Sequence, residues 1–425
     1  MEKVVVADVS GRLLAEAIEE IFDAFGGIRV ALPATEQVFI KPNASGFAPY
    51  THTAPQVLSA VLGYLRDHGY RQLRVMDSSG QGLFTRLVFK AVGYDDVCRR
   101  FGATPVYLDE RKTIAIALDG GSAPIHVPRM VYEELIVAPA RNSYLSIPKL
   151  KTHPTTTVSL NLKGQQAFVS GLDRSRDHNH RLHQHVASLY RLLQPDFCIV
   201  DGLQTLMQDV DGAVDRQVVD LGILIGGANA LAVDSVGARI LGYAPDDVAH
   251  LRLATDWTPA AANAEVIGDL SRFRERRAHV AGAPVPDGID VVEGQEQACP
   301  EGCQGSVLRA IQMLHRDFQG RGQFSVICGK GIDPARLDGL HGEILIVGPC
   351  AAAETAALLR ERYPDRPIHV INAHADLTEV FRHLCRLMGV RPRRLAPLPR
   401  IQIAWLWLLA RLNGLDANVP FFLKG

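Results

Sequence analysis

The sequence predicts an α/β protein: a main domain with a largely parallel sheet and flanking helices, plus a second, smaller α/β domain. Short apolar, β-prone segments alternate with amphipathic segments in the first half of the chain, which is typical of β–α units. The alternation returns later, after a segment dominated by Arg, Ala, Pro and Gly. A chain of 425 residues is long enough for each domain to bury its own core.

The elements of the main domain follow from hydrophobic periodicity. Short apolar runs predict strands, and apolar residues spaced three and four apart predict helices. We expect strands at residues 3–9, 38–41, 73–77, 104–108, 135–138, 197–201 and 221–225, and helices at residues 11–25, 55–68, 83–91, 182–193 and 228–241.

The second domain repeats this pattern on a smaller scale. In open parallel sheets, ligands bind beyond the carboxyl ends of the strands, so polar residues there are the first candidates for a site. We expect strands at residues 289–292, 324–328, 344–347 and 368–371, with helices at 304–318, 351–362 and 377–388. The predicted organisation is a main domain at 1–255, a linker at 256–288, the smaller domain at 289–395, and an apolar helix with a tail at 396–425.

The bulk composition argues against several classes of function. The 45 basic and 46 acidic residues give a net charge of −1, so nucleic acid is not an expected partner. No apolar run approaches the ~18 to 20 residues of a transmembrane helix, and the first residues resemble a strand and not a signal peptide. The 7 cysteines are scattered and do not resemble a secreted disulfide framework. We therefore expect a cytoplasmic protein with reduced thiols.

The segment 146–153, SIPKLKTH, places two lysines and a histidine at the end of an apolar strand. Lys149 and Lys151 alternate with a leucine, so both ammonium groups should point to one face. One interpretation is a solvated strand end, which is usual for a lone lysine. The other is a ligand-facing cluster in which the lysines bind an anion and His153 acts in catalysis.

Two other strands of the main domain end in polar loops. The strand at 38–41 leads through Lys41 and Asn43 to Thr51 and His52, just before a helix, a combination suited to an anion. The strand at 73–77 ends at Asp77 and continues into a Gly/Ser turn. That turn is neither GxGxxG nor a Walker loop, so by itself it predicts only a turn and a helix start.

Further polar candidates follow along the chain. Asn161 and Lys163 come after the lysine-rich segment, and Asp201 follows the strand at 197–201. Asp234 lies inside a predicted helix, where a buried carboxylate needs a partner. These acidic groups could orient a lysine or histidine.

A histidine-rich segment precedes the helix at 182–193. His180 and His183 are three residues apart and His178 precedes them, so together they could bind a divalent metal. The alternatives are a solvated helix start, or a single histidine acting as acid or base.

Four cysteines of the second domain should lie toward one edge of its sheet. Cys299 and Cys303 form a CxxxC before a helix, and Cys328 and Cys350 end strands. They could hold an iron–sulfur cluster or a metal ion. Their spacing matches no ferredoxin or zinc-ribbon pattern, so buried reduced thiols are the alternative.

A series of motifs in the main domain resembles the family catalogued as domain of unknown function 362, over about residues 38–245. The motifs are KPN at 41–43, TH at 51–52, the strand ending at Asp77, PKLKTH at 148–153, LKG at 162–164, PDFCIVDG at 195–202 and ALAVD at 230–234. Members are often described as iron–sulfur-associated, and the family is distantly similar in architecture to the nickel-pincer lactate racemases. The resemblance implies a two-domain α/β architecture, and the similarity to the racemases is one of fold alone. The ferredoxin-type module that many members carry is not expected here, because the chain has no CxxCxxC run.

We expect an intracellular enzyme that binds a small carboxylate or phosphate between its domains and uses lysine and histidine acid–base chemistry. Its lysines would bind the anion, its asparagines and Thr51 would orient it, and Asp77, Asp201 or Asp234 would fix charge and tautomer. The acid or base would be His153, His52 or His180. One alternative is a redox or cofactor-maturation protein that uses the four cysteines. Another is a binding protein whose helix at 401–412, with Trp405 and Trp407, contacts a second copy or a membrane surface. The competing interpretation of this helix is that it packs back on the body of the protein, as most apolar helices do.

Overall fold

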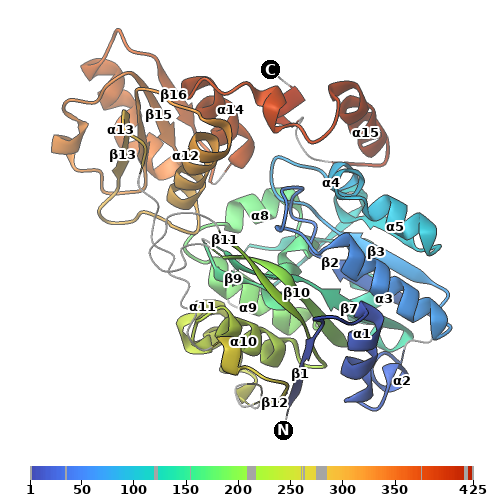
Figure 1. Ribbon diagram of the computed structural model, residues 1–425. Coiled ribbons are helices and arrows are strands. Elements are labelled where there is room, and N and C mark those ends of the chain that lie inside the picture. The colour runs from blue at the N-terminus through green and yellow to red at the C-terminus, as the bar shows by residue number, and fades with distance from the viewer. Residues whose placement is uncertain are drawn as a thin grey trace. The chain divides into compact units, whose positions relative to one another are not determined.

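The computed structural model describes residues 2–33, 36–118, 123–153, 155–207, 217–259, 261, 264–273, 285–374, 376–415 and 420–423. The chain forms two compact units, each with its own sheet (Figure 1). Unit 1 comprises Met1–Ser170, His183–Ala281 and Leu408–Asp416, and unit 2 comprises Gly171–Leu182, Gly282–Trp407 and Ala417–Gly425.

The main sheet of unit 1 has the strand order β12-β1-β11-β10-β7-β2-β3-β4, with β8 pairing β10 and β9 pairing β8. Along the main path only β11 runs against its neighbours, so the predicted largely parallel sheet is confirmed. The strands are β1 (Lys3–Asp8), β2 (Gln37–Pro42), β3 (Leu73–Asp77), β4 (Thr104–Tyr107), β7 (Asn142–Ile147), β8 (Lys149–His153), β9 (Thr157–Ser159), β10 (Phe197–Met207), β11 (Gln217–Gly227) and β12 (Glu265–Ile267); β5 (Thr113–Ile116) and β6 (Ile125–Pro128) form a separate hairpin.

Helices and short segments cover both faces of this sheet. Val38 and Ile40 of β2 belong to one core and Phe39 to another, as expected where successive side chains point to opposite faces. The first core includes residues of α1, α3, α4 and α5, and the second includes residues of the β5–β6 hairpin and α9. The helices of unit 1 are α1 (Leu14–Asp23), α2 (Ile28–Ala31), α3 (Pro55–Asp67), α4 (Thr85–Val92), α5 (Tyr94–Arg100), α6 (Arg129–Val131), α7 (Asn161–Gly164), α9 (Leu182–Leu192), α10 (Ala230–Ile240) and α11 (Ala249–Thr255).

The strand predicted at 135–138 is wrong. This segment lies in a π-helix, Tyr132–Val137, and the strand β7 begins only at Asn142. Leu135 is buried whereas Val137 is 62% exposed, so the apolar run is not embedded on both sides as a central strand would be. Pro139, which has no N–H to donate to a strand ladder, follows directly.

Unit 2 contains a four-stranded parallel sheet in the order β13-β14-β15-β16, as the alternating pattern predicts. Part of the predicted linker, residues 274–284, lies outside the described residues. The α8 helix, Gly171–Asp177, also belongs to unit 2. The other elements are β13 (Ile289–Glu293), α12 (Cys303–Phe318), β14 (Phe324–Cys328), β15 (Glu343–Val347), α13 (Pro349–Arg362), β16 (Ile368–Ile371), α14 (Leu377–Leu387) and α15 (Arg400–Leu412), whose last residues fall in unit 1.

The contact between α1 and β11 generates a test of the fold. A Cβ atom built on Gly226 would lie 2.1 Å from Cγ2 of Ile21, so Gly226→Ala should overpack this core and lower the free energy of unfolding by roughly 1–3 kcal/mol. Urea denaturation followed by circular dichroism measures the loss. Gly171→Ala is the control, because nothing lies within 4 Å of its added Cβ; equal effects of both substitutions would contradict this packing.

Candidate functional site

The polar residues after β2, β3 and β7 converge at a topological switch point of the main sheet. From β2 the chain proceeds to β3 and β4 on one side, and it then returns to β7, which pairs with β2 on the other side. In open α/β sheets, the loops at such a point diverge and form the usual ligand site. Lys41, Asp77 and Lys149 therefore lie where the fold favours a site.

A buried ion pair joins β8 to β10. Lys149 Nζ lies 2.9 Å from Asp201 Oδ2, and their side chains are 2% and 0% exposed. The same carboxylate oxygen accepts a 2.7 Å hydrogen bond from the backbone N–H of Ala54, the residue before α3, while Oδ1 accepts from Leu203 N–H. Asp201 thus holds the β2–α3 loop, the lysine segment and its own strand together.

A second buried ion pair joins β2 to β3. Lys41 Nζ lies 2.9 Å from Asp77 Oδ1, with side chains 5% and 3% exposed. Asp77 Oδ2 accepts a 2.5 Å hydrogen bond from the backbone N–H of Ala44. Both of these lysines, which the sequence suggests as ligand contacts, are therefore neutralised by aspartates within the protein. We assign the two pairs to holding the edge of the sheet in place.

Hydrogen bonds join the two ends of the loop between β2 and α3. Asn43 N–H donates to Thr53 Oγ1 at 2.8 Å, and Thr53 N–H donates to Asn43 O at 3.0 Å. The hydroxyl of Tyr94 donates to Thr53 O, and burial raises the pKa of Tyr94 well above its ordinary value, with Asp77 and Asp201 adding to the shift. The tyrosine stays protonated and fastens the loop. The Asn43 side chain accepts a 3.0 Å hydrogen bond from Ser45 Oγ.

Lys151 connects this loop to β8 across the switch point. Its ammonium group donates to the carbonyl oxygen of Thr51 and lies 3.5 Å from Ser45 Oγ. The residue is only 7% exposed. Both contacts join the ammonium group of Lys151 to the β2–α3 loop.

His52 lies in the same loop as a neutral imidazole. Burial is the main cause that lowers its pKa to about 4, and the ammonium groups of Lys151 and Lys149 add to the shift. Its Nδ1 is buried and, among the residues that the structure describes, has no hydrogen-bond partner. An imidazole in this state can accept a proton or a hydrogen bond from a bound molecule.

His153 lies at the end of β8, partly exposed. Its Nδ1 lies 3.3 Å from the backbone N–H and 3.0 Å from the hydroxyl of Thr155. Because the backbone N–H can only donate, Nδ1 is an acceptor and the proton of the neutral ring is on Nε2. The neighbouring threonine thereby fixes the tautomer.

A third cluster surrounds Asp234 on α10. Asp234 is fully buried and accepts hydrogen bonds from the backbone N–H groups of Asn161 and Leu162 and from Asn161 Nδ2, at 2.7–3.0 Å. Despite these donors, burial raises its pKa to about 7. The cluster adjoins Lys41, because a Cβ added to Gly164 would lie 3.8 Å from Lys41 Nζ. Lys163 Nζ donates to Gln166 Oε1 at 2.6 Å.

The predicted histidine metal site is divided between the two units. His178 and His180 belong to unit 2, where His180 Nδ1 lies 3.0 Å from Gln297 Nε2, and His183 belongs to unit 1. There, His183 Nδ1 lies 3.4 Å from Nδ1 of the fully buried His250. In the described part of the chain, no group of three or more His, Cys, Asp or Glu residues could hold a metal ion.

The four cysteines of unit 2 are free thiols in the described part of the chain. All four are among the described residues, and they do not gather into a set of three or more ligands. Burial raises the pKa of Cys299, and raises that of Cys328 further, with Cys303 and Cys299 contributing to the second shift. Ligation requires thiolates, which burial disfavours. The cluster assignment stays a prediction from the sequence.

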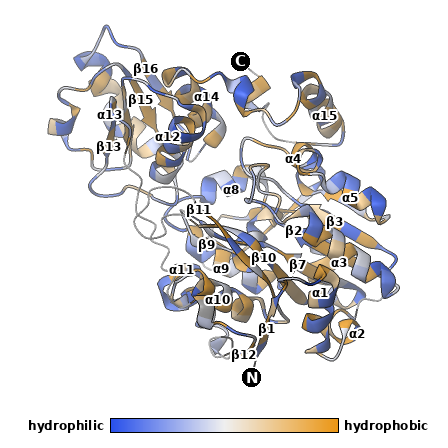
Figure 2. Ribbon diagram, in the orientation of Figure 1, coloured by the Kyte–Doolittle hydropathy of each residue, from blue (hydrophilic) through white to orange (hydrophobic). Residues whose placement is uncertain are grey.

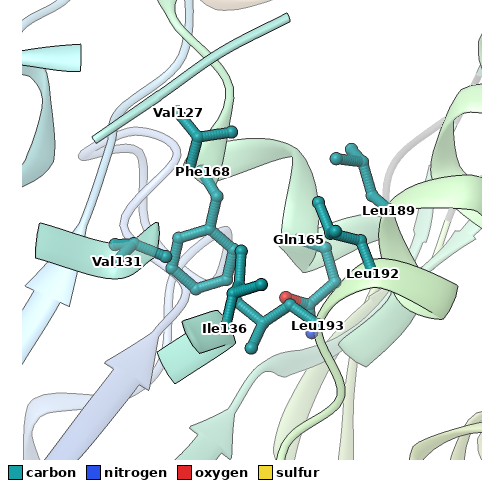
Figure 3. Close-up of a pocket in the computed structure, with 8 residues that line it drawn as sticks. All are labelled: Val127, Val131, Ile136, Gln165, Phe168, Leu189, Leu192 and Leu193. Carbon is teal, nitrogen blue, oxygen red and sulfur yellow. The ribbon is translucent and has the colours of Figure 1, made fainter. Parts of the chain in front are cut away.

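A small apolar pocket in unit 1 lies behind Phe168 (Figure 3). Phe168, which lines this pocket, also lies near the charged edge, because Lys41 Nζ is 5.8 Å from its ring centroid. None of the lining residues is charged, and the pocket is therefore poorly suited to an anion. The lining residues are Val127, Val131, Ile136, Gln165, Phe168, Leu189, Leu192 and Leu193.

Sequence reasoning missed the residues that shape the β2–α3 loop. Thr53 Oγ1 donates a 2.5 Å hydrogen bond to Ile147 O of β7, and Ser79 Oγ donates to Ala44 O at 2.8 Å. Ser79 belongs to the Gly/Ser turn after Asp77, so that turn serves to support the loop. The Thr-His-Thr pattern at 51–53 could have indicated from the sequence that Thr53 belongs to the site. No sequence pattern indicates the role of Tyr94, which lies on α5 far along the chain.

Comparisons with known proteins bear on the segment that carries these loops. Residues 38–239 match the model of the family described as Domain of unknown function (DUF362), which confirms the resemblance and includes the converging loops. No curated protein matches the chain. The chain is also similar to a crystal structure of a Thermotoga maritima structural-genomics protein, at 10% identity and a TM-score of 0.35, over 89% of this chain and 82% of that one.

The Lys149–Asp201 pair should be strongly coupled. Lys149→Met leaves a buried carboxylate without its cation, and we expect a loss of about 3–5 kcal/mol in the free energy of unfolding. Asp201→Asn should also destabilise, and the double variant should lose at least ~1 kcal/mol less than the sum. Urea titrations measure all three values, and additive losses would contradict the pairing. Arg141→Met, which breaks the exposed ion pair with Glu36, is the control and should have little effect.

Proposed function

We propose that the DUF362 segment, residues 38–239, forms the active site of a cytoplasmic enzyme that binds a small carboxylate or phosphate and transfers protons with histidine. The anion would lie at the carboxyl edge of β2, β3 and β7, against the loop 43–53 and the segment 149–153. The free thiols of all seven cysteines support a reducing compartment.

The observation that carries the proposal is the position of Lys151. It is a buried ammonium group at the switch point, contacting Thr51 and Ser45 of a loop that is tied down on both sides. We assign Lys151 to the ligand because it is buried at the switch point and contacts the loop that would surround the anion. A cation held by rigid surroundings binds an anion without a large reorganisation cost.

Two histidines supply acid–base capacity beside that cation. His52 is neutral with Nδ1 buried, and is thus suited to accept a proton from the bound molecule. His153 accepts the Thr155 N–H at Nδ1, so its neutral ring carries the proton on Nε2 and is suited to donate a hydrogen bond to the bound molecule. His52 as the base that takes and returns the proton, with His153 as a hydrogen-bond donor to the substrate, favours proton-transfer chemistry over a purely structural role. The metal alternative lacks a comparable ligand set among the described residues.

Lys151→Met and His153→Gln test the binding and chemical roles. Removing the ammonium group deletes a charge-assisted contact worth about 1.5–3 kcal/mol, so inorganic phosphate should bind roughly 10–100-fold more weakly to Lys151→Met in calorimetric titrations. His153→Gln should still bind phosphate. Native mass spectrometry of the wild type identifies the anion that it retains, and His153→Gln should not turn this anion over. Lys112→Met, at an exposed lysine of the same unit, is the matched control. Wild-type binding by Lys151→Met would contradict the proposal.

The pKa of His52 reports the anion independently of turnover. In the free protein, the folded-state pKa of about 4 lies below the unfolded value of 6.5, so His52 contributes stability above pH 6.5 that is lost as the pH falls toward 4. A bound anion favours the imidazolium and should raise this pKa. Nuclear magnetic resonance titration of ring-labelled histidine, with and without sulfate, measures the shift, and His52→Gln identifies the signal. An unchanged pKa in saturating sulfate would place the anion elsewhere.

A further inference from the structure

The α15 helix exposes an apolar stripe where a surface helix would normally be polar. Ile401, Trp405, Leu408 and Leu412 are 88%, 58%, 44% and 75% exposed. Their spacing of four, three and four residues places them within an arc of about 60° at 3.6 residues per turn. The helix carries apolar segments over much of its length (Figure 2).

The opposite side of α15 is already used for packing. Ile403 and Ala410 are fully buried, and both lie about half a turn away from the exposed stripe. The helix is therefore anchored to the protein by one face and presents a second apolar face outward. Ordinary core packing explains the first face but not the second.

The surroundings of the stripe are basic. Between Gly389 and Leu415 the sequence contains Arg391, Arg393, Arg394, Arg400 and Arg411, and no Asp or Glu. All five arginines are exposed. The whole chain has a net charge of −1, so this concentration of positive charge is local and is not a reflection of overall composition. Arg400 and Arg411 lie on α15 itself, beside the stripe.

We propose that α15 docks the protein on the surface of an anionic lipid bilayer. The exposed stripe would enter the boundary between headgroups and acyl chains, where tryptophan is favoured, while Arg400 and Arg411 would contact lipid phosphates. The arginine-rich charge selects this partner over a second copy of the chain, because two copies would bring like charges together. In the described part of the chain, no helix is long and apolar enough to cross a membrane.

Vesicle flotation of the full-length protein tests the proposal. The protein should float with vesicles of phosphatidylcholine and phosphatidylglycerol, should remain at the bottom with pure phosphatidylcholine, and should be released by high salt. Trp405→Glu should abolish flotation. Arg400→Gln with Arg411→Gln should weaken binding by about thirtyfold, as expected for roughly 1 kcal/mol per arginine near an anionic surface. Leu13→Glu, at a residue 69% exposed on unit 1, is the matched control and should float like the wild type.

Three further measurements distinguish docking on lipid from unfolding of the helix and from self-association. The fluorescence emission of Trp405 should shift to the blue on adding anionic vesicles, whereas unfolding of the helix would not produce a blue shift. Trp405→Phe should remove the shift. Circular dichroism of Trp405→Glu should match the wild type. Failure to float with anionic vesicles, or equal flotation of Trp405→Glu, overturns the proposal. A dimer in gel filtration that Trp405→Glu dissociates also overturns it, because a second copy would then cover the stripe.

Discussion

The candidate site depends on the carboxylate of Asp201, buried in the middle of β10. It neutralises Lys149, accepts the N–H that precedes α3, and accepts from Leu203, so it joins three segments that are far apart in the sequence. A carboxylate without exposure to water requires such partners, and each partner is thereby fixed in position. The orientation of the β2–α3 loop and of the lysine segment 149–153 therefore follows from the need to pair the buried carboxylate of Asp201.

The charges at this edge are held in place by contacts within the protein. Asp77 and Asp201 hold two of the lysines, Tyr94 fastens the loop, and His52 is kept neutral by burial and by nearby ammonium groups. An arrangement of this kind costs folding stability, since a pair of buried ions is often no better than apolar residues of the same size. What it provides is a fixed electrostatic environment, which is the property that binding sites for small anions need.

The sequence predicts which strands end at the site but not how the site is held together. Lys41, Asp77 and Lys149 stand out because they follow apolar runs, and strand ends are marked locally. The pairing of Lys149 with Asp201, and the support from Thr53 and Tyr94, arise from tertiary contacts that no local pattern encodes. The wrong strand at 135–138 has a similar cause, because apolar content does not reveal whether both faces of a segment will be covered. Spacing alone groups His180 with His183, yet the chain passes from one unit to the other between them.

That crossing has a consequence for how the chain acquires its structure. Unit 2 combines the short segment Gly171–Leu182 with residues from Gly282 onward, and Gln297 hydrogen-bonds to His180. During synthesis, residues 171–182 emerge long before the residues from Gly282 onward, so unit 2 cannot be completed until most of the polypeptide has left the ribosome. For the same reason a single cut near residue 288 would not release an intact half, because it would separate the early segment from its partners. Each unit is therefore built from segments that lie far apart in the sequence. Neither unit is a single stretch of chain that could be transferred to another protein.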